Sequence, residues 1–407
     1  MARLKVALVH DYLKEFGGAE RVLKVLTEIY PKAPIYTAFR VKNSIAGKEF
    51  KGKKIHESFL APLLKIWKLY SPLRFLTPLI WKSLDLSSFD LVITSSSWYI
   101  TRGFKVGPKT KVICYCHTPP RWLYGYETSV SFTKYWPVRI YGAIVGHFLR
   151  MYDWTVSQKP DRNQFKFKSK IRGGVDYFIA NSKNVQERIK KFYRRDSTVI
   201  YPPVDVEKII KATRNLKKTE GPELLESERP RSRRPAEGEN YFLMVSRLVG
   251  AKGLEEAAKA VKKYKFNLKI AGETHGFSDV SDQLKKLSGG NIELLGRVSD
   301  SKLYELYGKA KGFIALAREE DFGITPVEAM AAGIPVIAFN GGGFLESVID
   351  GVTGLLIDDT NEKSIGEAIK KFEKTKIKPE DCINQAKKFS KERFKREIKE
   401  FVRNRVI

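Results

Sequence analysis

The chain has 407 residues, of which 43% are hydrophobic, and it carries a formal net charge of +28. This length is sufficient for two domains with separate cores. Three cysteines exclude a disulfide framework and predict a reducing compartment. No run approaches the ~18 apolar residues that a membrane-spanning helix needs, and the short run Val6–Val9 predicts a strand rather than a signal peptide.

The positive charge has three competing explanations. One is a lysine-rich surface of the kind seen in heat-tolerant proteins. The second is attraction to the anionic inner face of the plasma membrane, which would make a cytoplasmic protein peripheral. The third is nucleic-acid binding, which we do not expect, because the basic residues are spread along the chain and no nucleic-acid motif occurs.

The first half of the chain alternates short apolar runs with helical patterns. Strands are predicted at Lys5–Val9, Leu91–Ser95, Val112–Cys116, Tyr177–Ala180 and Thr198–Tyr201, and helices at Ala19–Ile29 and Val185–Phe192. The segment Ser58–Trp81 is rich in Leu, Trp and Phe with interspersed basic residues. A basic helix with one apolar face, formed by Phe59, Leu60, Leu63, Leu64 and Trp67, would lie in a membrane interface or pack on the domain core, and both readings stay open.

Two features of this half suggest a site. Gly17 and Gly18 open the first helix, where glycine lets the backbone approach a ligand and helix amides suit a phosphate, although a plain loop would look the same. His117 ends a strand and is well placed to face a cleft. The loop after it carries possible acceptor-binding side chains at Arg121, Trp122 and Tyr124.

A metal site was considered at Cys114, Cys116 and His117. Two thiols and one imidazole lack the second ligand pair of a structural zinc site. Buried cysteines in a strand are the favoured reading. We therefore expect neither a metal nor another cofactor.

The second half repeats the alternation after a polar, proline-bearing stretch at residues 214–240, which predicts a flexible insertion. Strands are predicted at Tyr241–Val245, Leu268–Ala271, Ile292–Leu295, Gly312–Ala317 and Val336–Ala338, and helices at Leu254–Val261 and Gln385–Val402. Two such series predict an α/β protein with two doubly wound parallel sheets, which bind ligands at the carboxyl ends of their strands.

Glu320 and Glu328 lie eight positions apart around a predicted helix start. Thr325 suits the N-cap and Pro326 the first helical position, so the helix would run over Val327–Ala332. A helix N-terminus suits phosphate, and carboxylates accept hydrogen bonds from sugar hydroxyls. Together they suggest a nucleotide-sugar site.

This segment resembles the Glu-x7-Glu motif of the retaining glycosyltransferases of family 4 (glycosyl transferases group 1), which have the GT-B fold. Further motifs recur in the family's order: Gly17-Gly18, His117-Thr118-Pro119-Pro120, and Ser246-Arg247 with Lys252-Gly253. Three stretches are similar to a mannosyltransferase-like subgroup: His10-Asp11-Tyr12, Cys116-His117-Thr118-Pro119-Pro120 and Tyr201-Pro202-Pro203-Val204-Asp205. The last of them departs from the commoner Asn-Gly-Val-Asp turn.

The resemblance implies three parts. Residues 1–200 with 388–407 would form an acceptor-side Rossmann-like domain, to which the last helix crosses back. Residues 201–240 would be a linker with the polar insertion. Residues 241–387 would form the nucleotide-sugar-binding domain, with an interdomain cleft between the two.

It also implies roles for single residues. Arg247 and Lys252 would clamp the leaving diphosphate, where fixed cations stabilise developing negative charge without a metal. His117 would contact the transferred sugar near the reacting carbon, and Glu320 would accept its hydroxyls. The remaining donor contacts are implied at Gly17, Gly18, Ser246, Arg297, Val298, Phe322, Gly323, Ile324, Thr325 and, for the ribose, Glu328.

The sequence thus predicts a retaining, metal-independent hexosyltransferase. The favoured donor is GDP-mannose and the acceptor a glycan or a lipid-linked sugar. Front-face substitution is favoured over a mechanism with Glu320 as nucleophile. The alternatives are a UDP-sugar donor, or a catalytically silent protein that binds a nucleotide sugar or glycan.

Overall fold

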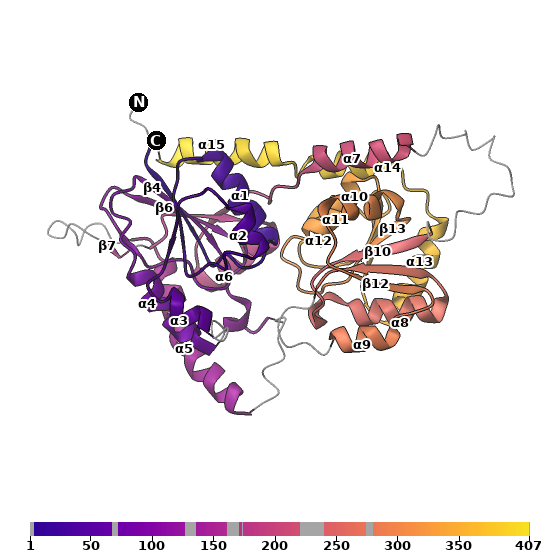
Figure 1. The fold of residues 1–407 in the computed structure, drawn as a ribbon, viewed down its shortest axis with the longest axis horizontal. Helices are drawn as coiled ribbons and strands as arrows, with labels where there is room; N and C mark the ends of the chain where they lie inside the picture. Colours follow the sequence, from indigo (N-terminus) through magenta and orange to yellow (C-terminus); the bar gives the residue numbers. More distant parts are fainter. Residues whose placement is uncertain are drawn as a thin grey trace. The chain divides into compact units, whose positions relative to one another are not determined.

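The computed structural model describes residues 4–66, 72–126, 136–160, 171–172, 174–219, 240–273 and 280–406. The chain divides into two compact units (Figure 1). Unit 1 comprises residues 1–126, 132–203 and 392–407, and unit 2 comprises residues 127–131 and 204–391. Each unit has its own parallel sheet, which confirms the predicted α/β class with two Rossmann-like domains.

The sheet of unit 1 has seven parallel strands in the order β3-β2-β1-β4-β6-β8-β9. Their bounds are β1 Val6–His10, β2 Ile35–Thr37, β3 Ile55–Glu57, β4 Leu91–Ser96, β6 Lys111–Cys116, β8 Tyr177–Ala180 and β9 Ser197–Val199. All residues of β1 are buried, as a central parallel strand requires. Because β2 and β3 lie on one side of β1 and β4 on the other, the topological switch point falls between β1 and β4.

Helices cover both faces of this sheet. The helical segments are α1 Gly18–Ile29, α2 Ile45–Glu49, α3 Ala61–Lys65, η2 Pro72–Leu76, α4 Thr77–Lys82, η3 Arg121–Leu123, α5 Trp136–Ser157, α6 Lys183–Tyr193 and α15 Lys391–Val406. Side chains of α1 and α15 share one core cluster with the sheet, and those of α3 and α4 share another. A separate antiparallel pair joins β5 Lys105–Val106 to β7 Ile171–Arg172.

The sheet of unit 2 has six parallel strands in the order β12-β11-β10-β13-β14-β15. Its strands are β10 Tyr241–Val245, β11 Asn267–Ala271, β12 Ile292–Gly296, β13 Gly312–Ala315, β14 Val336–Phe339 and β15 Gly354–Ile357. Its helical segments are α7 Val206–Thr219, η6 Gly250–Lys252, α8 Leu254–Tyr264, α9 Val280–Leu287, α10 Asp300–Lys309, α11 Ile324–Ala331, α12 Phe344–Ser347, α13 Glu362–Lys374 and α14 Pro379–Lys387. The switch point lies between β10 and β13.

The C-terminal helix predicted over Gln385–Val402 is in fact two helices, α14 and α15. Lys388 and Phe389 form a turn between them, and Ser390 forms a parallel bridge with Val204. The Val204 amide donates to the Phe389 carbonyl (3.0 Å), and the Lys391 amide donates to the Val204 carbonyl (2.9 Å). The two chain connections between the units therefore lie side by side, and α15 belongs to unit 1.

Three further predictions were wrong in detail. The helix after Glu320 begins at Ile324 with Gly323 as its N-cap, so Thr325 is not the cap. The helix with an apolar face from Phe59 to Trp67 is shorter than predicted, because α3 spans only Ala61–Lys65; Trp67 lies outside the described part. The predicted linker contains α7, whose Val206, Ile209 and Ile210 are buried, and residues 220–239 lie outside the described part.

Candidate active site

Two of the predicted site residues meet at the switch point of unit 2. Lys252 ends η6, which follows β10, and Glu320 follows β13. The Lys252 Nζ lies 2.5 Å from Glu320 Oε2, and the two side chains are 22% and 19% exposed. The pair is partly buried, and the exposed part of each side chain can be reached by a ligand. Sequence reasoning named both residues but not their ion pair.

The backbone brings these two groups together through a close approach. Gly253, which follows Lys252, has a positive φ of 67°. A Cβ on Gly253 would lie 2.5 Å from the Leu316 Cβ, just beyond the end of β13. Glycine is therefore required here for both space and conformation, and it holds η6 against the segment that leads to Glu320.

A glycine loop after β14 supports the Glu320 backbone. The Gly343 amide donates to the Glu320 carbonyl (2.9 Å). A Cβ on Gly342 would lie 2.5 Å from that carbonyl oxygen, and one on Gly343 would lie 2.3 Å from the Phe322 Cα. Sequence reasoning missed this loop, although three consecutive glycines directly after a predicted strand were a visible signal.

The start of α11 lies next to Glu320. Gly323 has a φ of 85° and caps the helix with no side-chain hydrogen bond, so the first helical amides point past the N-terminus. Phe322 is buried and its ring lies against Phe389 (5.2 Å between centroids). Ile324 and Thr325 form the first turn of the helix rather than preceding it. A helix start beside a lysine suits a phosphate.

Glu328, predicted to hold a ribose, lies on the buried side of α11. Glu328 is only 2% exposed. The Tyr307 hydroxyl donates a hydrogen bond to Glu328 Oε2 (3.1 Å). This contact fixes the carboxylate within unit 2, and its role toward a ribose remains a prediction.

The other predicted donor residues follow β10 and β12 at the same edge of the sheet. Arg247 is exposed, and Ser246 Oγ donates to the Arg247 carbonyl (3.0 Å). Arg297 Nη1 lies 3.5 Å from Glu273 Oε2 at the surface, and Val298 beside it is half-buried. The segment after β11 connects them, because the Leu248 amide donates to the Glu273 carbonyl (2.9 Å) and the Gly272 amide donates to the Gly296 carbonyl (2.8 Å). The structure thus brings these residues to one edge of unit 2.

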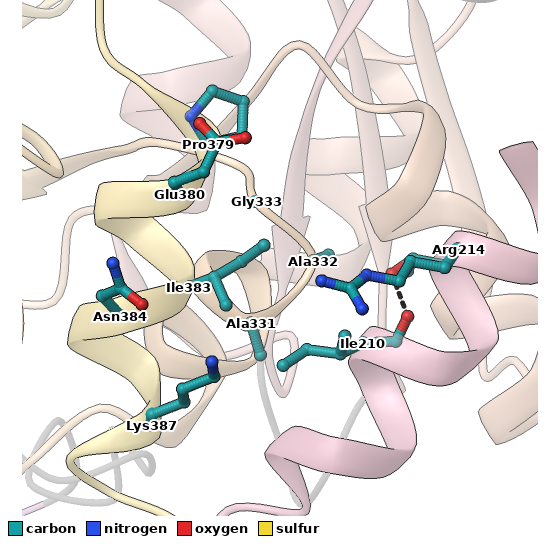
Figure 2. A pocket seen from close by; sticks show the side chains of 11 residues that line it. Ile210, Arg214, Ala331, Ala332, Gly333, Pro379, Glu380, Ile383, Asn384 and Lys387 are labelled. Carbon is teal, nitrogen blue, oxygen red and sulfur yellow. Dashed lines mark hydrogen bonds between the residues drawn. The ribbon is translucent and has the colours of Figure 1, made fainter.

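A cavity of about 420 Å³ in unit 2 contains none of these residues. Figure 2 shows Ile383 and Lys387 of α14 facing Ile210 and Arg214 of α7 across it. It also reaches Gly333, beyond the C-terminal end of α11, whereas the candidate donor site lies at the N-terminal end. We do not assign the chemistry to this cavity.

In unit 1 the switch point carries a buried chain of hydrogen bonds. His10 Nε2 lies 3.3 Å from Glu20 Oε1, and His10 Nδ1 lies 3.0 Å from Ser95 Oγ. Ser95 Oγ in turn lies 2.8 Å from His117 Nε2. His10 and Ser95 come from the adjacent strands β1 and β4, which are paired in register at these two residues. Sequence reasoning found His117 but not the three groups behind it.

Burial sets the protonation state of His117. Burial, and to a lesser extent His10, lowers the pKa of His117 to about 3, so the imidazole is neutral near pH 7. A carboxylate only accepts, so His10 Nε2 carries a proton toward Glu20. The Ser95 hydroxyl lies between the two imidazoles and can donate a hydrogen bond to one ring nitrogen while accepting one from the other.

One backbone amide of the predicted glycine loop takes part in the same chain of hydrogen bonds. Gly17 is the N-cap of α1, and its amide donates to Glu20 Oε2 (2.8 Å). That amide is therefore used within unit 1, while Gly18 is exposed beside it. The glycines hold the carboxylate that orients His10, a connection that sequence reasoning did not foresee.

Asp11 anchors the loop after β4. Its Oδ2 accepts from the Ser97 amide (3.1 Å), the Ser97 hydroxyl (2.9 Å) and the Trp98 amide (2.6 Å). Its Oδ1 accepts from the Thr101 hydroxyl. A buried carboxylate with this many donors is satisfied and rigid, so Asp11 positions the loop next to His10.

The candidate acceptor residues differ in their contacts. Arg121 and Trp122 lie in η3 and are half-buried. The Arg74 guanidinium lies 4.2 Å from the Trp98 ring centroid and 4.9 Å from that of Trp122. The rings of Trp98 and Trp122 thus form an aromatic surface with the Arg74 guanidinium on it. Trp122 follows His117 closely in the sequence.

Tyr124 is held by the fold. Its hydroxyl donates to Asp153 Oδ2 (2.8 Å), and its ring stacks on Phe192 at 4.1 Å between centroids. Asp153 is itself buried and ion-paired with Arg102. These contacts give Tyr124 a structural role, and a role in acceptor binding remains a prediction.

The metal site considered at Cys114, Cys116 and His117 has no supporting geometry. His117 Nε2 faces Ser95 instead, and both cysteines are buried. Among the residues that the structure describes, no three His, Cys, Asp or Glu side chains group so as to hold a metal ion.

Two family models match the sequence. Glycosyltransferase Family 4 matches residues 16–208, and Glycosyl transferases group 1 matches residues 226–389. An uncharacterized glycosyltransferase of Methanocaldococcus jannaschii is 35% identical over 158 residues, which is 38% of this chain and 45% of that protein. The alpha-1,3/1,6-mannosyltransferase ALG2 of Dictyostelium discoideum is 25% identical over 286 residues, 63% of this chain and 60% of that protein. The matches thus span less than two thirds of either relative.

Solved structures agree on the fold. HepE of Anabaena, solved in complex with UDP and glucose, superimposes with a TM-score of 0.65 at 16% identity, over 98% of this chain and 99% of that one. Sucrose-phosphate synthase of Thermosynechococcus elongatus gives a TM-score of 0.65 at 15% identity, over 99% of both chains. At these identities the likeness shows the GT-B fold alone. The two family models together span both units, so the chain combines a Glycosyltransferase Family 4 domain with a Glycosyl transferases group 1 domain.

Proposed function

We propose that this protein transfers a hexose from a nucleotide sugar to an acceptor hydroxyl. The observation that carries the proposal is the ion pair of Lys252 and Glu320 at the switch point of unit 2, beside the N-terminus of α11. A cation and helix amides suit a diphosphate, and a carboxylate next to them suits sugar hydroxyls. The two family matches support the same reaction class.

The residues would divide the work as follows. Lys252 and Arg247 stabilise the negative charge that develops on the departing diphosphate, a task for which fixed cations suffice without a metal. Glu320 orients the sugar through its hydroxyls. His117, neutral near pH 7, forms a hydrogen bond with a hydroxyl of the sugar being transferred.

The ion pair also favours front-face substitution with retention. A nucleophilic Glu320 would have to approach the anomeric carbon to about 3 Å. Its Oε2 is instead 2.5 Å from a lysine ammonium, which draws electron density from the carboxylate and orients it. In the front-face route the leaving phosphate oxygen takes the acceptor proton, and Glu320 only positions the sugar.

GDP-mannose is the donor we favour, and a UDP-sugar is the alternative. The mannosyltransferase ALG2 and the subgroup motifs around His10 and Tyr201 support the first. The complex of HepE with UDP and glucose supports the second. A cytoplasmic site of action and an acceptor that is a glycan or a lipid-linked sugar complete the proposal.

A thermal-shift screen with GDP, UDP, GDP-mannose and UDP-glucose tests the donor. A ligand at 100 times its dissociation constant should add about 2.7 kcal/mol to the free energy of unfolding. We expect the guanosine ligands to shift Tm and the uridine ligands not to. The reverse result would assign a UDP-sugar donor, and a shift by the nucleotide sugar without release of nucleoside diphosphate, tested with a range of glycan and lipid-linked acceptors, would favour the silent binding protein.

A further inference from the structure

One surface of unit 1 collects most of the exposed large hydrophobic side chains. Among the described residues, 13 of the 16 exposed large hydrophobics lie in α5 or between Phe59 and Leu79. On α5 they are Trp136, Val138, Ile140, Tyr141, Ile144, Phe148, Met151 and Trp154. Figure 1 shows α3, α4 and α5 together at one end of unit 1. The Tyr141 hydroxyl donates to the Pro72 carbonyl, which ties α5 to η2.

Helix α5 has its polarity reversed relative to an ordinary surface helix. Its buried positions include Gly146, Asp153 and Ser157, whereas its large apolar side chains face outward. Exposed Ile140, Ile144 and Phe148 follow at intervals of four and share one face. Residues 136–144 are exposed on every side. An apolar helix face of this size on a water-facing surface marks an interaction site.

The charges around this surface are almost all positive. Residues 58–84 contain no Asp or Glu, and residues 136–157 contain only Asp153, which is buried and paired with Arg102. Lys82, Arg139 and Arg150 lie among the apolar side chains. A partner must therefore be both apolar and anionic. A second copy would bring like charges together in a chain of net charge +28, and a nucleic-acid duplex offers no apolar face.

From these exposed apolar and basic side chains we infer that α5, with the α3–α4 segment beside it, is the surface through which unit 1 binds an anionic phospholipid bilayer. None of the described helices is long and apolar enough to cross a membrane. A helix of 22 residues is about 33 Å long and can lie along the headgroup boundary instead. The tryptophans at both ends, Trp136 and Trp154, are side chains that favour this boundary.

The same helix is connected to the acceptor side of the site. The core cluster under α5 contains Leu149 and Val156 together with Leu123 of η3, and Trp122 packs against it. Arg150 Nη1 donates to the Leu123 carbonyl (3.1 Å). The loop that follows His117 thus rests on the inner face of α5. This placement deepens the proposed function, because a lipid-linked acceptor would reach that loop from the membrane surface.

Vesicle co-sedimentation of the full chain tests the inference. We would replace Ile144 (56% exposed) and Phe148 (66%) together, as Ile144→Glu with Phe148→Glu, and use vesicles of phosphatidylglycerol and phosphatidylcholine in equal parts. The matched control replaces Ile349 (41% exposed) and Val352 (44%) of unit 2 with Glu. The α5 variant should lose at least about tenfold in partition coefficient, since burying each such side chain is worth well over a factor of ten. The control should bind like the wild type.

Several outcomes would overturn the inference. Equal binding by the α5 variant and the control, or no binding by the wild type at low salt, would do so. Self-association of the wild type in sedimentation velocity that the α5 variant abolishes, without vesicle binding, would make this face a contact between copies. Binding is measured without donor or acceptor, so failure here and failure of sugar transfer are separate results. Circular dichroism of the α5 variant confirms that it is folded.

Discussion

The two units place very different polar groups at equivalent points of their sheets. At the switch point of unit 1, Glu20, His10, Ser95 and His117 are buried and joined in a chain. At that of unit 2, Lys252 and Glu320 form an ion pair that is partly exposed. Charges are costly to bury unless they are hydrogen-bonded, as the Glu20 carboxylate is to His10 and to the Gly17 amide. Unit 1 can therefore hold His117 in a fixed position, and unit 2 can receive a charged ligand.

Removing the Lys252 ammonium group should have the largest effect on turnover. Lys252→Ala should lower kcat by about a hundredfold to a thousandfold, because the departing diphosphate loses a fixed positive charge. Folding should hardly change, since the pair is partly exposed. The matched control is Lys259→Ala on α8, which breaks an exposed pair with Glu255. Turnover at saturating donor decides the matter: a normal kcat in Lys252→Ala would remove this residue from the leaving-group site.

Displacing the Glu320 loop should have the next largest effect. In Gly343→Ala the new Cβ would lie 2.3 Å from the Phe322 Cα, so the backbone has to move and the bond to the Glu320 carbonyl is disturbed. We expect kcat/KM for the donor to fall by about tenfold or more. Gly142→Ala on α5 is the control, because nothing lies within 4 Å of its Cβ. Steady-state kinetics that match the wild type would show that this loop does not hold the carboxylate.

Breaking the chain of hydrogen bonds in unit 1 should have a smaller effect on the enzyme, and this effect should act through His117. Ser95→Ala leaves one nitrogen of each histidine without its partner, which should cost about 1–3 kcal/mol of unfolding free energy. It should also let His117 adopt both tautomers. Nitrogen-15 NMR of histidine-labelled protein measures the tautomer directly. The same tautomer in the variant and the wild type would mean that Ser95 only fills space.

The low pKa of His117 should make stability depend on pH. Burial lowers this pKa from 6.5 to about 3, so the unfolded chain takes up this proton at a higher pH than the folded chain does. The stability due to neutral His117 is present above about pH 6.5 and is lost as the pH falls toward 3. Between about pH 6 and pH 4 the wild type should lose up to about 1.4 kcal/mol per pH unit more than His117→Gln does. Parallel curves from urea unfolding would contradict the buried, neutral state.

The sequence predicted the strands of both sheets well, and the reason is physical. Strands such as β4, β6 and β10 are buried on both faces and therefore appear as continuous apolar runs. Lys252 and Glu320 could be found because each follows such a run, and the carboxyl ends of parallel strands meet at one edge.

The rest could not be read from local patterns. His10 and Ser95 are 85 residues apart, so only the pairing of β1 with β4 reveals their contact. Helix α5 was missed because its outward face is apolar, which reverses the usual pattern. The start of α11 was misplaced because the Thr-Pro signal is local. In the structure the N-cap is Gly323, which has a positive φ and packs against Phe344, a residue distant in the sequence.

The return of α15 has a consequence for synthesis of the chain. Phe394, Ile398, Phe401 and Val402 complete the core around a first strand that begins at Val6. A ribosome makes this strand long before α15, so the cluster cannot close until α15 has also been made. Unit 2, apart from the residues 127–131, ends at Lys391 and is made in one stretch before that. During synthesis unit 1 therefore stays incomplete until α15 is made, whereas unit 2 can already fold.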